Sequence, residues 1–227
     1  MSNINDRISI QVGLSGYSFK IESEGISSVS GWLPAESFFR VPQMQKRYSD
    51  VRLSIFTPYC TLVPRTFFRP EVSKELLSDV VELPESALVD FVELPEFDAV
   101  MVFSPTIGGT LHKVISESVL KVDGTGTRLL PEMYHMLMGI RSMSEYNRIV
   151  ASYMDGVLYL VISQGNTLLL CNTYTAQDFV TAQYFIFLAM KKLQLNPEVS
   201  SVYFRTPLDE DQQMSLYRYF MNVEHII

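Results

Sequence analysis

The stretch whose residue types most suggest chemistry is glycine-rich, KVDGTGTRLLPEMY at residues 121–134. Gly124 and Gly126 lie between a predicted strand and a predicted helix, where a dinucleotide-binding turn would hold phosphate. The third glycine of such a turn would be at position 129, which is a leucine, and no strand–helix–strand unit surrounds the stretch. We therefore interpret this loop as a structural turn.

Side chains that bind metals or act as nucleophiles are scattered along the chain. No histidine has a cysteine, a second histidine or a carboxylate at metal-ligand spacing; the three are His112, His135 and His225. An acidic run could form a cation site, but it spans predicted loops and strands and is better interpreted as a solvated face (Glu82, Glu85, Asp90, Glu93, Glu96 and Asp98). No local signature marks a nucleophile. The sequence therefore indicates no catalytic residue, no metal ligand and no cofactor.

Composition excludes several classes of protein. With 227 residues and 47% apolar content, the chain can bury a core as one large domain or two lobes. Cys60 and Cys171 are too few for a disulfide framework, so we interpret them as reduced, mostly buried thiols. The net charge of -7 opposes phosphate backbones and anionic lipid surfaces, and no apolar run is long enough to cross a bilayer. We predict a cytoplasmic protein without nucleic-acid binding or membrane insertion.

The first half of the chain is predicted to be mixed α/β. Alternating apolar residues predict a hairpin at residues 7–21, and helical spacing of apolar residues predicts a helix at 69–83. A short strand is expected at 119–123, followed by a helix at 128–143 that has Pro131 in its first turn. Further strands are expected at 26–34, 51–58, 60–64, 87–94 and 97–105, a weak helix at 36–49 and another helix at 109–119.

The second half has a simpler order of elements. Three strands are followed by a long helix, a buried strand and a closing helix, at 148–154, 156–163, 167–175, 175–195, 200–206 and 209–221. Thr175 and Asp178 resemble a capping box at the start of the long helix. A meander of three strands followed by helix, strand and helix is the order of a ribonuclease-H-like unit.

The opening hairpins of the two halves are similar in sequence. RISIQVGLSGYSFKIESEG at 7–25 aligns with NRIVASYMDGVLYLVISQG at 147–165. The alignment places Gly16 on Gly156, Phe19 on Tyr159, and Gly25 on Gly165. Together with the order of elements, it favours two related units in tandem, which is the actin-like architecture.

Several stretches carry a resemblance to a known family. The run CTLVPRTFF, the strands that end in LPEFDAVMVFSP, and the stretch from MDGVLYLVISQG to VSSVYF resemble an uncharacterised bacterial family of cytoplasmic proteins in the actin-like (ASKHA) superfamily. The chain is distantly similar to the pilus-assembly and cell-division members, which act chiefly as scaffolds and adaptors. The resemblance covers about residues 7–205 and implies an α/β fold: an actin-like architecture of two ribonuclease-H-like lobes with mixed sheets, at 1–145 and 146–227.

The same resemblance directs attention to the two hairpins. In nucleotide-binding members of the superfamily, each hairpin holds phosphate and magnesium through an Asp-x-Gly turn. Here the first hairpin is neutral at Gln11, two residues before Gly13, where a carboxylate is needed. In the second, Ser152 stands near that place and Asp155 belongs to the turn itself, while Arg-Thr-Pro at 205–207 replaces the paired glycines near the nucleoside. We therefore predict degenerate phosphate loops.

The helix at 175–195 has more apolar surface than one stripe requires. One face holds Phe179, Ala182, Phe185, Ile186, Ala189 and Leu193. Tyr184, Phe187 and Leu188 spread around the rest of the helix, so either it lies between two layers or part of it meets another chain.

Two hypotheses follow. The leading one is a non-catalytic scaffold or adaptor, a pseudo-ATPase that binds a protein partner or forms a homodimer, with Tyr184, Phe187 and Leu188 as binding candidates. The alternative is a nucleotide sensor or enzyme of the actin-like superfamily, which would use altered phosphate loops in the cleft between the lobes.

Overall fold

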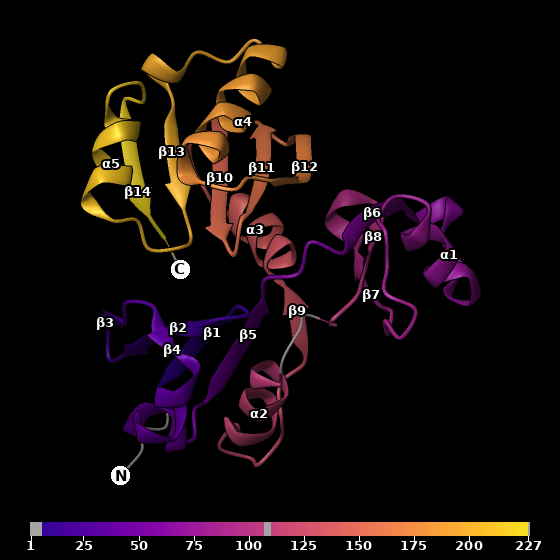
Figure 1. Ribbon diagram of the computed structural model, residues 1–227, viewed down its shortest axis with the longest axis vertical. Helices are drawn as coiled ribbons and strands as arrows, with labels where there is room; N and C mark the ends of the chain where they lie inside the picture. The colour runs from indigo at the N-terminus through magenta and orange to yellow at the C-terminus, as the bar shows by residue number, and fades with distance from the viewer. Residues whose placement is uncertain (1–5, 107–109, 227) are drawn as a thin grey trace. The chain divides into compact units, whose positions relative to one another are not determined.

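The computed structural model describes residues 6–106 and 110–226 (Figure 1). By proximity the chain forms two compact units, one from the segments 1–57 and 104–132 and the other from 58–103 and 133–227. The division into ribonuclease-H-like lobes at 1–145 and 146–227 stays a prediction.

The first unit is built on a mixed sheet. Its main path has the order β3-β2-β1-β5-β9, and β4 pairs with the outer side of β2. β1 pairs antiparallel with β2 and parallel with β5, and β5 pairs parallel with β9. The strands are β1 (Arg7–Val12), β2 (Gly16–Ser23), β3 (Ile26–Val29), β4 (Leu33–Pro34), β5 (Asp50–Ile55) and β9 (Leu129–Pro131).

The apolar face of this sheet forms the core of the first unit. Alternate residues of β1, β2 and β5 are buried there, including Ile10, Phe19 and Leu53, as period-two alternation predicts. They pack against Ile115 of α2 (Leu111–Ser118) and against two short 3-10 helices, η1 (Ala35–Arg40) and η2 (Pro42–Gln45). The opposite face of the same strands carries polar side chains.

The second unit repeats the topology of the first sheet. Its large sheet has the order β12-β11-β10-β13-β14, again with an antiparallel meander and two parallel pairings. The elements are β10 (Asn147–Met154), β11 (Val157–Gln164), β12 (Thr167–Thr175), α4 (Phe179–Lys192), η6 (Pro197–Val199), β13 (Ser201–Phe204), α5 (Glu210–Tyr217) and β14 (Asn222–His225). The predicted meander-helix-strand-helix order is therefore present, and the structure confirms the α/β fold class.

A smaller sheet belongs to the second unit by proximity. It has the order β6-β8-β7, with β6 (Cys60–Pro64), β7 (Asp90–Leu94) and β8 (Ala99–Phe103) all antiparallel. Its own apolar cluster includes Val63 and Val102 of the sheet and Leu77 of α1 (Ser73–Ser78). Three single-turn 3-10 helices flank these elements, at Arg65–Phe67, Pro70–Val72 and Pro95–Phe97.

Several local predictions were wrong. Residues 119–123 form no strand, because Val119 ends α2 in the core and only Lys121 makes an isolated bridge, to Tyr48. Pro131 is the last residue of β9, and α3 (Glu132–Ile140) begins after it. The helix predicted at 69–83 forms only as a 3-10 turn at Pro70–Val72 and as α1, in which Leu77 is the buried residue. The long helix is capped by Asp178, which accepts from the Thr181 N–H, so Thr175 caps nothing.

The weak helix predicted at 36–49 forms as η1 and η2, and Pro42 starts the second of these. No helix in the described ranges is long and apolar enough to span a membrane.

Candidate functional site

The first predicted loop residue, Gln11, belongs to a row of buried polar side chains. The register of β1 aligns Gln11 with Ser18 on β2 and with Ser54 on β5, so the three lie side by side across the sheet. All three are at most 3% exposed. The row lies on the face opposite the apolar core, at the carboxyl ends of parallel strands, which is where open α/β sheets bind ligands.

A buried carboxylate completes this row. Glu132 follows β9 directly, starts α3 and is 0% exposed. The Gln11 amide Nε2 donates to Glu132 Oε1 at 3.0 Å, and Ser54 Oγ donates to the other carboxylate oxygen. Ser18 Oγ donates to Gln11 Oε1 at 3.1 Å. Both ends of the Gln11 amide are therefore used inside the protein, and we call Gln11, Ser18, Ser54 and Glu132 the polar row.

Sequence analysis missed Glu132. Its signal was weak: an acidic residue directly after an apolar stretch, at the start of a helix, where a carboxylate is favoured by the helix dipole. That signal places a charge at a helix terminus and does not say that the charge is buried. Its pairing with Gln11 depends on the parallel register of β1, β5 and β9, which connects residues far apart in the chain.

Of the remaining loop positions, Gly13 and Asp155 lie in backbone turns and Ser152 lies in a strand. The Gly13 N–H donates to the Gly16 carbonyl at 3.0 Å and closes the first hairpin. Asp155 and Gly156 form the second turn, with φ of +52° and +75°, as a two-residue hairpin loop requires. Ser152 is fully buried within β10. Gln11 and Gly13 thus belong to the first unit, and Ser152 and Asp155 to the second.

The stretch that follows β13 is fastened to the end of β10. The Arg205 N–H donates to the Ala151 carbonyl at 2.9 Å, and the Tyr153 N–H donates to Thr206 Oγ1 at 3.0 Å. The Tyr153 hydroxyl donates in turn to the Ala176 carbonyl at 3.1 Å. Arg205 and Thr206 stand where the paired glycines were expected, and here they bind backbone groups of the second unit.

The predicted binding residues of α4 are partly accessible. Tyr184 is 59% exposed, whereas Phe187 and Leu188 are half-buried. The Phe187 ring packs against the rings of Tyr219, at 4.9 Å between centroids, and Phe220, at 5.6 Å. Beside these rings is a hollow of about 400 Å³, which we call the α4–α5 hollow; it is lined by Phe187, Asn196, Pro197, Glu198, Arg218 and Tyr219.

More apolar side chains are exposed on the same two helices and the segments next to them. Each is between 44% and 73% exposed; they are Val180, Val199, Met214, Tyr217, Tyr219 and Met221. α4 and α5 are joined by a hydrogen bond from Gln183 Nε2 to Ser215 Oγ at 2.7 Å, so they are neighbours. The sequence left two alternatives for α4, a place between two layers or a contact with another chain. In the single chain part of α4 is exposed to solvent, as the second alternative requires.

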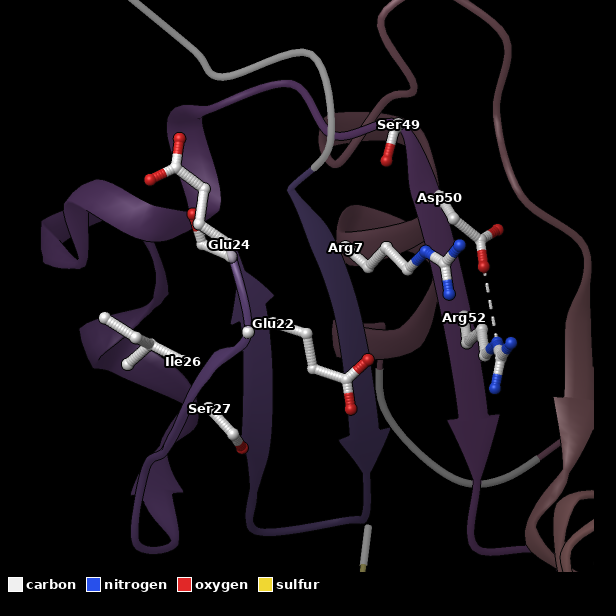
Figure 2. A pocket seen from close by; sticks show the side chains of 10 residues that line it. Arg7, Glu22, Glu24, Ile26, Ser27, Ser49, Asp50 and Arg52 are labelled. Carbon is white, nitrogen blue, oxygen red and sulfur yellow. Dashed lines mark hydrogen bonds and ion pairs between the residues drawn. The ribbon is translucent and has the colours of Figure 1, made fainter.

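A larger but shallower depression lies on the first unit, over the polar face of its sheet. Its volume is about 1000 Å³, and its walls carry Arg7, Glu22, Glu24, Asp50 and Arg52 (Figure 2). Arg52 pairs with Asp50 at 3.3 Å, and Lys20 pairs with Glu22 at 2.9 Å. The hydrogen bond from Lys20 and its charge lower the pKa of Glu22. Charges of both signs share the depression and two of its carboxylates are paired with cations, so it offers no clear binding chemistry.

The two cysteines line one cavity of about 210 Å³ in the second unit. Both are free thiols. Burial raises the pKa of Cys60 to about 12 and also raises the pKa of Cys171. Because the thiolate is the nucleophile, thiols that stay protonated at neutral pH are weakly reactive.

Metal-ligating side chains are not clustered in the part of the chain that the structure describes, where no three histidines, cysteines or carboxylates could share an ion. His112 is buried in α2, and burial, followed by the charge of Lys113, lowers its pKa. In the acidic run, Glu93 forms an exposed ion pair with Arg65 at 3.2 Å.

The repeated sheet topology defines the chain as an actin-like protein, and the comparisons agree. A solved structure from Bacteroides thetaiotaomicron VPI-5482, described as having an actin-like ATPase fold and unknown function, matches with a TM-score of 0.69 and 16% identity, over 100% of this chain and 94% of that one. A chain of the PilM-PilN type IV pilus biogenesis complex matches with a TM-score of 0.53 and 13% identity, over 97% and 88%. At such identities the likeness shows the fold alone.

The family follows from the sequence itself. The chain belongs to the family described as "Protein of unknown function (DUF3822)", whose model matches residues 4–223. A search of curated proteins gave no significant match. The resemblance to an uncharacterised actin-like family is therefore confirmed.

Proposed function

We propose that this protein is a non-catalytic actin-like scaffold or adaptor of the cytoplasm, which binds a protein partner or a second copy of itself. The observation that carries the proposal is the exposed apolar surface of α4 and α5, where Tyr184 is 59% and Tyr219 54% exposed beside the α4–α5 hollow. Contiguous exposed apolar surface on a soluble domain commonly marks an interaction site.

The polar row supports the non-catalytic part of the proposal. A phosphate loop needs backbone or side-chain groups that are free to meet phosphate and magnesium. Gln11 instead uses both atoms of its amide on Glu132 and Ser18. Binding a nucleotide there would require these buried hydrogen bonds to be replaced, which opposes occupancy.

The fold comparison supports the protein-binding part. The structure of the PilM-PilN type IV pilus biogenesis complex holds an actin-like chain within a protein complex. A domain of this fold can thus be part of a protein complex, and we propose the same kind of role for this family.

The test is affinity capture from the native cell, with the partners identified by mass spectrometry. We expect Tyr184→Asp to remove the specific partner, because a charge in an apolar interface is left without a partner. Phe67→Asp is the matched control, since Phe67 is 74% exposed on a different part of the chain. Analytical ultracentrifugation of both variants distinguishes a partner from a homodimer. Identical capture by the wild type and Tyr184→Asp would contradict the proposal for this surface.

A nucleotide sensor or enzyme is the second candidate, and Glu132 is the observation that favours it. A carboxylate that is 0% exposed, at the carboxyl ends of parallel strands, stands where a metal or a water molecule could be held in an α/β protein. In this alternative the polar row would open when a ligand binds, and magnesium-ATP binding to the purified protein would then be measurable.

A further inference from the structure

One cation lines the α4–α5 hollow and two more stand at the end of α4, within five residues of Phe187. Lys191 and Lys192 stand in the last turn of α4, and Arg218 lines the hollow directly after α5. All three are exposed, and among the described residues none of their side chains forms an ion pair or a hydrogen bond. Glu198 is the one carboxylate in the lining. With Lys191 and Lys192 at the end of α4, three cations stand against this one carboxylate, on a protein whose net charge is -7.

The apolar part of the same surface is continuous with these cations. Tyr184, Phe187 and Lys191 are three and four residues apart on α4, so they lie along one face of the helix. Phe187 and Tyr219 form one wall of the hollow, with their rings at 66° to each other. Pro197 lies in the lining as well. Aromatic side chains therefore extend along α4 to the hollow, and Lys191 follows them on the same face.

The walls of the hollow are held in place by the core. Phe187 stacks on Phe220, which is 4% exposed and belongs to the apolar cluster of the second unit. The Tyr217 hydroxyl donates to the Val223 carbonyl at 3.0 Å and fixes the end of α5 against β14. A preformed hollow loses little conformational entropy on binding, which favours affinity.

We propose that the α4–α5 hollow binds an acidic segment of the partner protein, with one aromatic or large aliphatic side chain in the hollow and carboxylates on Arg218 and Lys191. This inference rests on the proposed function and adds the chemistry of the partner. Arginine and tyrosine are the residues most enriched where interfaces gain their affinity, and guanidinium groups bind carboxylates through paired hydrogen bonds.

A second copy of this chain fits the surface less well. In a two-fold symmetric contact the same patch meets itself, so both copies of Arg218, Lys191 and Lys192 would be brought into one interface. Like charges brought together in an interface oppose binding. An acidic segment removes that repulsion and also neutralises these cations.

The experiment is selection of a phage-displayed library of random linear peptides on the intact protein, followed by fluorescence anisotropy with the strongest peptide. We expect enriched peptides to carry an aromatic or large aliphatic residue close to two or more Asp or Glu residues. Binding should weaken at least about tenfold in Arg218→Glu and in Tyr184→Ala, because both remove contacts of the type that dominates interfaces. It should also weaken as salt is added.

Matched controls separate this surface from general effects. Lys113→Glu makes the same charge change at an exposed position of α2, and Phe67→Ala removes a ring that is more exposed than Tyr184, so both should leave peptide binding unchanged. All four positions are exposed, and thermal unfolding should show that each variant remains folded.

Four results would overturn the inference. Enriched peptides without acidic residues, or binding that is insensitive to Arg218→Glu, would show that the cations play no part, while leaving the proposed partner binding intact. Failure to enrich any peptide would refute a linear-segment site on the hollow, and the capture experiment with Tyr184→Asp would still decide the proposed function. Sedimentation with phosphatidylserine vesicles that is lost in Arg218→Glu would assign the surface to a membrane instead.

Discussion

The two units contain sheets of the same topology, but the polar side chains of the first are buried whereas apolar side chains of the second are exposed. In the first, polar groups at the ends of parallel strands turn inward, where Gln11 and Glu132 satisfy each other. In the second, apolar groups of α4 and α5 face solvent, with Tyr184 more than half exposed. The difference is what the proposed function requires, with a ligand site that is closed by the polar row and a binding surface on α4 and α5.

The largest effect is expected from the polar row. Glu132→Ala leaves the buried Gln11 amide and Ser54 hydroxyl without their acceptor, which should lower the free energy of unfolding by about 3 kcal/mol. Chemical denaturation measures this change. Glu117→Ala, on the exposed side of α2, should cost less than about 0.5 kcal/mol.

The sign of that effect separates the two candidate functions. Residues kept for catalysis or ligand binding often destabilise the free protein, so their removal can stabilise it. A Glu132→Ala variant that is more stable than the wild type would therefore favour the nucleotide sensor. The polar row would then be a ligand site and not a network that stabilises the first unit.

The two hairpins should differ in how they tolerate alanine. A Cβ at Gly16 would lie 2.0 Å from the backbone oxygen of Leu33, which cannot move aside easily. We expect Gly16→Ala to destabilise the protein by about 2 kcal/mol through overpacking. At Gly156 the nearest atom is 3.7 Å away, and the cost of about 1 kcal/mol comes from the positive φ. Equal thermal and denaturant stabilities of the two variants would show that the β2–β4 contact is looser than described.

The smallest effect on stability is expected on the exposed surface. Tyr184→Asp should change the free energy of unfolding by less than about 0.5 kcal/mol, because the side chain is mostly in solvent. Urea unfolding of this variant is also the control for the capture experiment. A loss of several kcal/mol would mean that Tyr184 supports the fold and that its loss of partner binding is indirect.

Much of the fold could be predicted from local sequence pattern. The meander at 147–175 and the helix that follows it form close to their predicted bounds, since half-buried strands and an amphipathic helix leave periodic signals. β14 was missed because it is an edge strand in which only Val223 is buried. β9 was missed because its place is set by parallel pairing with β5, a partner that local pattern does not reveal.

The candidate sites were predictable to different degrees. The apolar excess of α4 was visible in the sequence because exposure on a helix follows from spacing along one element. The polar row was not, since it joins Gln11 to Glu132 across 121 residues and depends on the register of three strands. Local signals locate a surface, whereas a buried network needs the tertiary structure.

The measurement that tests the central claim most directly is isothermal titration of the purified protein with magnesium-ATP. If the polar row is closed and the protein is a non-catalytic scaffold, the dissociation constant should be weaker than about 10 μM, the equivalent of about 7 kcal/mol of binding. A constant of that value or tighter, which is lost in Glu132→Ala, would contradict the account and assign the protein to nucleotide sensing.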